Sequence, residues 1–169
     1  MDVQDPRDRY DDLLEEHDVG EVDAETFAAM GDNEAFSMGW VAVGVTLDDD
    51  GRVLLVYDEQ DGQWVVPGGT VRPGETLREG VIRELREETG VPVDPVRPHA
   101  TVEHERRFEG RSRSFVVVHF ETTPRTTAVG DDLGEDDEHI VDADWFHDLP
   151  TETFDREFAA AVLRRVRED

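Results

Sequence analysis

Residues 69–91 read GTVRPGETLREGVIRELREETGV, and this stretch decides how the rest of the chain is interpreted. Thr76 and Glu79 follow a Pro-Gly turn in a capping-box pattern, which predicts that a helix begins near Thr76. Gly90 is suited to end that helix as a left-handed C-terminal cap. Between these ends the helix should carry one apolar face, formed by Leu77, Val81, Ile82 and Leu85.

Three carboxylates occupy a neighbouring stripe of the same predicted helix. Glu84, Glu87 and Glu88 stand at i, i+3 and i+4, in the half of the helix where the macrodipole is negative. Like charges at this spacing cost about 0.2–0.5 kcal/mol, which a hard divalent cation with oxygen ligands would remove. Arg83 can pair with Glu79 or Glu87 and orient a catalytic carboxylate. The alternative is a solvated acidic face, which would need no glycine, glutamate or arginine at fixed distances from it.

The spacing of Gly69, Glu75, Arg83 and the three carboxylates matches every fixed position of the Nudix box, so the chain resembles the Nudix hydrolases. The resemblance implies an α/β fold, an α/β/α sandwich with a mixed β-sheet. It also implies a metal-dependent hydrolase, using Mg²⁺ or Mn²⁺, that cleaves the pyrophosphate bond of a nucleoside diphosphate linked to another moiety. The alternative from another class is a non-catalytic nucleotide-sensing module, which usually has a degraded box or a DNA-binding extension.

The same resemblance suggests roles for individual residues. Glu84 and Glu88 are the expected metal ligands with Glu87 in support, and Gly69 would supply a backbone carbonyl. Glu138, in the acidic loop before Trp145, is the expected additional ligand. The catalytic set is then Glu84, Glu87 and Arg83. For the general base, Glu84 is favoured and an acid of the loop 135–138 is the alternative.

Composition limits the environment and the partners. The chain has 43 Asp and Glu against 17 basic residues, a formal charge of -26, and neither lysine nor cysteine. Acid excess without lysine resembles proteins of salt-in halophiles, since molar salt screens self-repulsion. So negative a protein binds nucleic-acid polymers poorly, which favours small nucleotides as substrates. No apolar run is long enough to span a membrane and the N-terminus is no secretory signal, so a cytoplasmic location is expected.

The remaining segments predict two units, an acidic helical N-terminal extension (1–36) and the Nudix hydrolase domain (37–169). The extension is a candidate arm, lid or homodimer contact. Residues 40–47 and 53–57 read as a β-hairpin around Asp48–Gly51, and residues 102–108 and 114–120 as another around Glu109 and Gly110. A short strand is expected over 140–146 and an amphipathic helix at the C-terminus.

The second predicted hairpin concentrates positive charge in a chain that has little. Arginine forks suit phosphate, so these residues are candidate substrate contacts, with ion pairing to Glu103, Glu105 and Glu109 as the alternative. The six histidines show no HxxxH or HExxH spacing, so sequence motifs predict no zinc site. The arginines concerned are Arg106, Arg107, Arg111 and Arg113.

Overall fold

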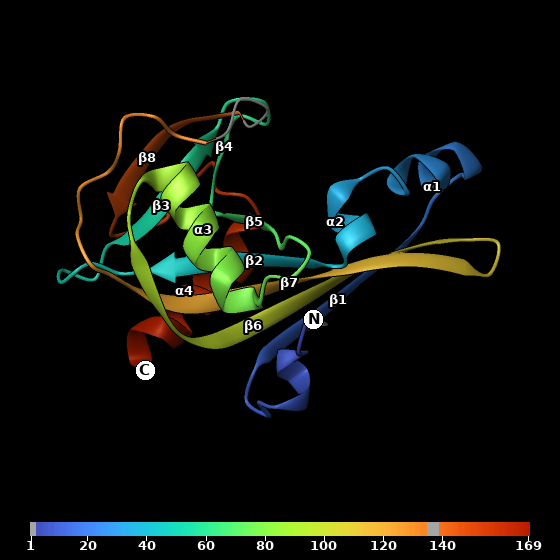
Figure 1. Ribbon diagram of the computed structural model, residues 1–169, viewed down its shortest axis with the longest axis horizontal. Coiled ribbons are helices and arrows are strands. Elements are labelled where there is room, and N and C mark those ends of the chain that lie inside the picture. Colours follow the sequence, from blue (N-terminus) through green and yellow to red (C-terminus); the bar gives the residue numbers. More distant parts are fainter. Residues whose placement is uncertain (1–2, 135–138) are drawn as a thin grey trace.

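The computed structural model describes residues 3–134 and 139–169 (Figure 1). Two sheets form its centre. The larger has the strand order β1-β6-β7-β2-β5 and the smaller the order β4-β3-β8. The strands are β1 (Leu14–Glu21), β2 (Trp40–Thr46), β3 (Val53–Asp58), β4 (Gln63–Val65), β5 (Gly68–Thr70), β6 (Val93–Phe108), β7 (Arg111–Pro124) and β8 (Ile140–Phe146). The helices are η1 (Pro6–Asp8), α1 (Ala24–Met30), α2 (Glu34–Met38), α3 (Leu77–Thr89) and α4 (Arg156–Glu168).

The expected α/β/α sandwich with a mixed sheet is confirmed. β1 runs parallel to β6 and β2 parallel to β7, whereas the other pairs are antiparallel. Each of the long helices α3 and α4 covers its own buried apolar cluster. Alternate residues of β3 divide between them, Leu54 and Val56 beneath α3 and Val53 and Leu55 beneath α4. A strand that is apolar on both faces is what a layer between two helices requires.

The predicted hairpin over 40–57 is wrong, although its turn exists. Asp48 N donates to Arg52 O at 2.9 Å and Gly51 has φ +80°, but a single bridge joins Leu47 to Val53 before the strands separate into different sheets. The reason is that a strand has only two edges. β2 uses one edge for β7 and the other for β5, so none remains for β3.

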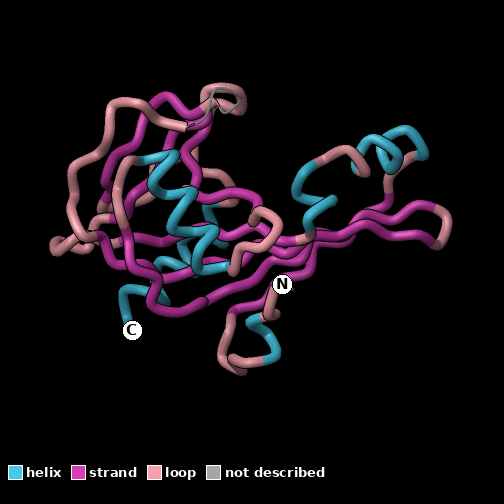
Figure 2. The backbone as a smooth tube through the Cα atoms, in the orientation of Figure 1, coloured by secondary structure: helices cyan, strands magenta, loops and turns pink. Residues whose placement is uncertain are grey.

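The hairpin around Glu109 and Gly110 is confirmed and is longer than expected. β6 and β7 pair from Val93↔Pro124 to Phe108↔Arg111, and both turn residues have positive φ. Its distal part leaves the sandwich as an arm that carries β1 on one edge, with α1 and α2 alongside (Figure 2). The strand over Ile140–Phe146 and the C-terminal helix are also confirmed.

The N-terminal extension is only partly helical, which corrects the expectation for residues 1–36. Residues Leu14–Glu21 form β1, which pairs with β6 over eight consecutive positions. Its sequence, LEEHDVGE, has weak strand propensity. The open edge of β6 supplies the backbone partners, and side chains such as Arg106, which donates to Asp18 Oδ2 at 2.9 Å, neutralise the acids. Within the described ranges, no helix is long and apolar enough to cross a bilayer.

Candidate active site and metal centre

Both ends of α3 are fixed in the way its sequence predicts. Thr76 Oγ1 accepts from Glu79 N at 3.1 Å, and Glu79 Oε1 accepts from Thr76 N at 2.9 Å, which completes the capping box. Gly90 ends the helix with φ 74°. The helix therefore starts and stops at residues that place its acidic half at a defined height above the sheet.

The apolar face of α3 fixes its rotation. Leu77, Val81 and Leu85 are buried in the cluster beneath the helix. At Gly44 of β2, a Cβ atom would lie 2.9 Å from Leu85 Cδ2, so the helix approaches the sheet more closely than a side chain would allow. Because this face is held against the sheet, the stripe of Glu84, Glu87 and Glu88 faces β5 and the turn that precedes α3.

Two of the three stripe carboxylates are buried against the backbone of β5. Glu84 is 7% exposed and Glu88 is 3% exposed. Gly68 N donates to Glu88 Oε2 at 3.4 Å, and a Cβ at Gly69 would lie 2.6 Å from the Glu84 carboxyl group. Glycine at position 69 lets the main chain lie directly against Glu84, whereas a Cβ at Gly68 would meet Ala42 and Val43 of β2. Glu87 borders the pair and stays half-buried.

Arg83 organises this cluster as a planar fork. On one side its Nε and Nη2 donate to Glu75 Oε2 at 2.7 Å and Oε1 at 2.9 Å. On the other side its Nη1 donates to Glu84 Oε1 at 2.8 Å and to Glu87 Oε2 at 3.2 Å. Nη2 also donates to Thr70 O at 3.1 Å. The guanidinium thus joins the turn, β5 and the helix, and it leaves Glu84 little freedom to rotate.

The sequence predicted part of this arrangement. Of the two expected partners of Arg83, Glu87 is confirmed. The other, Glu79, instead closes the capping box at the start of the helix. The bidentate partner, Glu75, was missed because it lies before the helix, where i,i+4 reasoning does not apply. The fixed position of Glu75 in the box was the sequence feature that could have indicated this partner. The hydrogen bonds from Arg83 hold the pKa of the Glu75 carboxyl below its ordinary range despite its partial burial.

The donor set fits a hard cation. The donors clustered here are the carboxylate oxygens of Glu84, Glu87 and Glu88, and Mg²⁺ or Mn²⁺ takes oxygen ligands rather than sulfur or imidazole. Burial of Glu84 and Glu88 on adjacent turns of one helix, beside a third acid, concentrates negative charge that a divalent ion would offset. The residues on this stripe are therefore suited to hold the metal.

The segment after β7 reaches the C-terminal end of α3. Gly130 N donates to Thr89 O at 2.9 Å, and Gly134 N donates to Glu87 O at 2.7 Å. These bonds satisfy carbonyls that a helix end leaves open. Sequence patterns do not indicate this contact, because a backbone N–H donor requires no particular residue type. Glu138 and the rest of 135–138 lie outside the described residues.

Three of the four arginines of the β6–β7 arm contact the N-terminal extension, and Arg107 pairs with an acid of its own strand. Arg106 donates to Asp18, and Arg107 Nε donates to Glu105 Oε2. Arg113 Nε donates to Phe27 O at 3.0 Å, and both Arg111 and Arg113 lie over the Phe27 ring. The arm carrying them points away from α3 (Figure 1). The structure does not bring these four side chains to the box carboxylates, and their substrate role stays a prediction.

An apolar cavity of about 350 Å³ opens on the face of the large sheet opposite α3. It begins beside β5, because Val43 in its wall pairs with Gly68. Burial, with a smaller contribution from His104, lowers the pKa of His119 in this cavity to about 4, so its ring is neutral at pH 7. The wall also includes Val66, Phe115, Val117 and Phe158.

Comparison with known proteins agrees with this geometry. The sequence model of the NUDIX domain matches residues 38–165. An uncharacterized Nudix hydrolase of Bacillus subtilis, YvcI, is 51% identical over 45 residues, covering 27% of this chain and 28% of that protein. The CTP pyrophosphohydrolase of Escherichia coli is 34% identical over 73 residues, covering 41% of this chain and 53% of that one.

Structural similarity extends beyond the box. A crystal structure of a UDP-X diphosphatase superposes with a TM-score of 0.57 over 87% of this chain and 72% of that one, at 20% identity, which supports the fold alone. The sequence matches to the two curated relatives span only 28% and 53% of their lengths. Since the family model covers most of the chain and the box residues are assembled on α3 and β5, this chain belongs to the NUDIX domain family.

Proposed function

We propose that this protein is a metal-dependent hydrolase that cleaves the pyrophosphate bond of a nucleoside diphosphate linked to another moiety. The observation that carries the proposal is the burial of Glu84 and Glu88 against the backbone of Gly68 and Gly69. Burying two carboxylates this closely is costly for a structural role and useful for binding a cation. Relatives named for CTP and ADP-ribose pyrophosphohydrolysis make the same reaction class the expected one.

The proposed ligands are Glu84, Glu87 and Glu88, the carbonyl of Gly69, and Glu138 from the later loop. When bound, Mg²⁺ or Mn²⁺ would neutralise charge on the phosphoryl oxygens and acidify the attacking water. The segment just before that loop is anchored to α3, because Gly134 N donates to Glu87 O. Asp131 and Asp132 lie in the same anchored segment.

In the reaction, the water oxygen forms a bond to phosphorus while the bond from phosphorus to the leaving phosphate oxygen breaks. A carboxylate must accept the water proton. We favour Glu84 because Arg83 fixes its Oε1, and an acid of 135–138 is the alternative. Arg83 acts as a positioning residue that keeps Glu84 and Glu87 in place through its second anchor, Glu75.

The proposed substrates are nucleoside triphosphates, ADP-ribose-like compounds and related molecules. The apolar cavity beside β5 is suited to the uncharged part of such a molecule, since most of its wall is Val and Phe. With its ring neutral, His119 adds no positive charge to this wall that would select an acidic group.

A panel of nucleotides tested with Mg²⁺ or Mn²⁺ at molar KCl is the decisive experiment. We expect metal-dependent turnover of at least one diphosphate-linked substrate, abolished by EDTA. The alternative is a nucleotide-sensing module, which would bind a nucleotide in a calorimetric titration without hydrolysing it. Binding without turnover across the panel would therefore overturn the enzymatic proposal and favour the sensor.

Two properties of the environment belong to the same proposal. The charge of -26 without lysine supports a halophilic protein acting in a high-salt cytoplasm, where charge repulsion is screened. The β6–β7 arm with the N-terminal extension offers a surface outside the sandwich for homodimer formation (Figure 2). Size measurement by light scattering at 0.2 M and 2 M KCl would test the dimer.

A further inference from the structure

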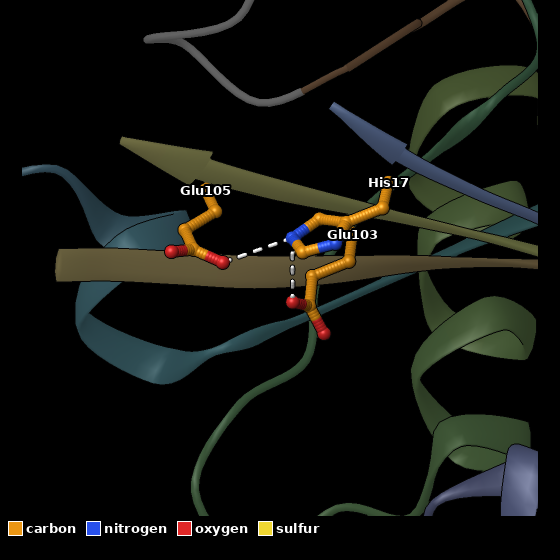
Figure 3. Close-up of side chains that lie close together, drawn as sticks. All are labelled: His17, Glu103 and Glu105. Atoms are coloured by element: carbon orange, nitrogen blue, oxygen red, sulfur yellow. Dashed lines mark hydrogen bonds and ion pairs between the residues drawn. The ribbon is translucent and has the colours of Figure 1, made fainter. Parts of the chain in front are cut away.

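One histidine of the N-terminal extension lies between two glutamates of the arm (Figure 3). His17 Nε2 is 2.9 Å from Glu105 Oε1 and 3.1 Å from Glu103 Oε2. One ligand atom from each of the three side chains lies within 4.8 Å of the others. The cluster stands on β1 and β6, whereas the box carboxylates stand on α3.

Strand geometry brings the three side chains to one face. Glu103 and Glu105 are two residues apart on β6, so both point to the same side of the sheet. In the parallel register His17 is opposite Glu103, which puts its ring on that side as well. Because all three come from paired strands and not from loops, their spacing is set by the backbone.

Two arginines orient the carboxylates of Glu103 and Glu105 by binding the oxygens that do not face His17. Arg7 Nη1 donates to Glu103 Oε1 at 2.9 Å, and Arg107 Nε donates to Glu105 Oε2. Each arginine therefore engages one oxygen, and the other oxygen of each glutamate faces His17. Outer partners of this kind commonly orient the ligands of metal sites.

Hydrogen bonding alone does not satisfy both glutamates that face His17. A neutral imidazole with its proton on Nε2 has one N–H to share between two carboxylates, while a divalent cation can bond all three groups at once. Zinc bonds of about 2.0–2.2 Å in tetrahedral geometry would separate ligand atoms by about 3.3–3.5 Å. The two separations from His17 Nε2, 2.9 and 3.1 Å, would have to widen by a few tenths of an ångström, and the two glutamate oxygens lie within 4.8 Å of each other.

We propose that His17, Glu103 and Glu105 form a second divalent-cation site, distinct from the catalytic one. The ion that this second site would bind is a borderline metal such as Zn²⁺. Imidazole is a poor ligand for Mg²⁺ or Ca²⁺ and a good one for zinc. Three protein ligands leave a position for water, and His17 remains accessible to solvent. A bound ion would cross-link β1 to β6 and so hold the N-terminal extension on the arm.

Sequence motifs could not reveal this site. The ligands are far apart in the chain, joined by parallel pairing of β1 with β6, so no short spacing such as HxxxH exists. In the described part of the chain, one other group has comparable geometry: His99, Glu121 and Asp169, in which His99 is buried. That group serves as a control.

The test is Zn²⁺ titration of metal-stripped protein against a chromogenic chelator, with the box site removed by Glu84→Gln/Glu88→Gln. We expect one tight equivalent, and an affinity at least tenfold weaker in His17→Gln and in Glu105→Gln. His104→Gln is the matched control, because His104 lies on the same strand pair but contacts a single carboxylate, Asp18. It and His99→Gln should keep the equivalent.

A second readout separates a metal site from a simple ion-pair cluster. Zn²⁺ should raise the melting temperature and slow amide exchange in β1, and both effects should vanish in His17→Gln. The proposal is overturned if the parent protein binds no stoichiometric Zn²⁺, or if His17→Gln retains its affinity. Loss of the equivalent in His99→Gln instead would assign the ion to the other cluster and equally reject the proposal.

Discussion

Substitution of Gly69 by alanine tests the site most directly, because it adds one methyl group against one carboxylate. The new Cβ would lie 2.6 Å from both Cδ and Oε1 of Glu84, whereas ordinary contacts begin at 3.4 Å. Gly69 does not have positive φ, so alanine brings no backbone strain of its own. The Glu84 carboxylate, held by Arg83 and nearly buried, would have to move by about 0.8 Å.

That displacement is large on the scale of catalysis. It would stretch the Arg83 Nη1–Glu84 Oε1 bond from 2.8 Å toward the limit of hydrogen bonding. Misplacement of a catalytic group by about 1 Å can cost on the order of 10²-fold, about 2.7 kcal/mol of transition-state stabilisation. We therefore expect kcat/KM of Gly69→Ala to fall by that factor, with weaker binding of Mn²⁺ measured by electron paramagnetic resonance.

The control is Gly20→Ala in β1, where a Cβ would meet only Arg106 at 3.6 Å or more. It should keep wild-type kcat/KM and Mn²⁺ affinity. Circular dichroism at working salt would verify that both variants fold. If folded Gly69→Ala turned over substrate within twofold of wild type, Glu84 would not depend on close approach to β5, and the site described above would be misassigned.

Four further measurements follow from the same structure. Glu88→Gln, which keeps size but removes charge, should lower kcat by on the order of 10²-fold at saturating Mg²⁺; near-normal kcat would remove Glu88 from the site. Turnover in ¹⁸O-water should label a phosphate product, and label found only in a sugar product would contradict attack on phosphorus. The melting temperature should rise as KCl increases from about 0.1 M to above 1 M, where the Debye length falls from about 10 Å to about 3 Å; a flat or falling midpoint would reject the halophilic interpretation. Because the pKa of His119 falls to about 4 in the folded state, the unfolded chain binds more protons below pH 6.5, so stability should drop by about 2 kcal/mol between pH 7.5 and pH 5; His119→Leu should lose most of that drop in denaturant titrations.

The box helix could be predicted in detail because its determinants are local. Caps, apolar period and acidic stripe are all set by residues within a few positions of one another, and Thr76, Gly90 and Glu87 lie where these rules place them. The strand at Ile140–Phe146 follows from the same kind of local pattern. What local rules could not supply was the partner of each element.

Failures occurred where tertiary pairing decided the outcome. The run 40–57 has the local pattern of a hairpin, but β7 and β5 occupy both edges of β2. Residues 14–21 have an acidic composition that disfavours strands, but the edge of β6 was open. In each case the deciding fact is which edges of a strand are free, and that depends on segments far away in the chain.

The arginines show the same limit for the site. From the sequence, four arginines on one hairpin indicate phosphate, because chemistry alone matches guanidinium to phosphate. In the fold, Arg106 and Arg107 meet Asp18 and Glu105, and Arg113 meets the backbone of Phe27. In a chain with 43 acids and 17 arginines, the arginines form intramolecular ion pairs wherever the fold brings acidic segments together. Arg83 is the instructive exception, because its acid partners include the box carboxylates, so the same pairing that stabilises the fold also shapes the proposed metal site.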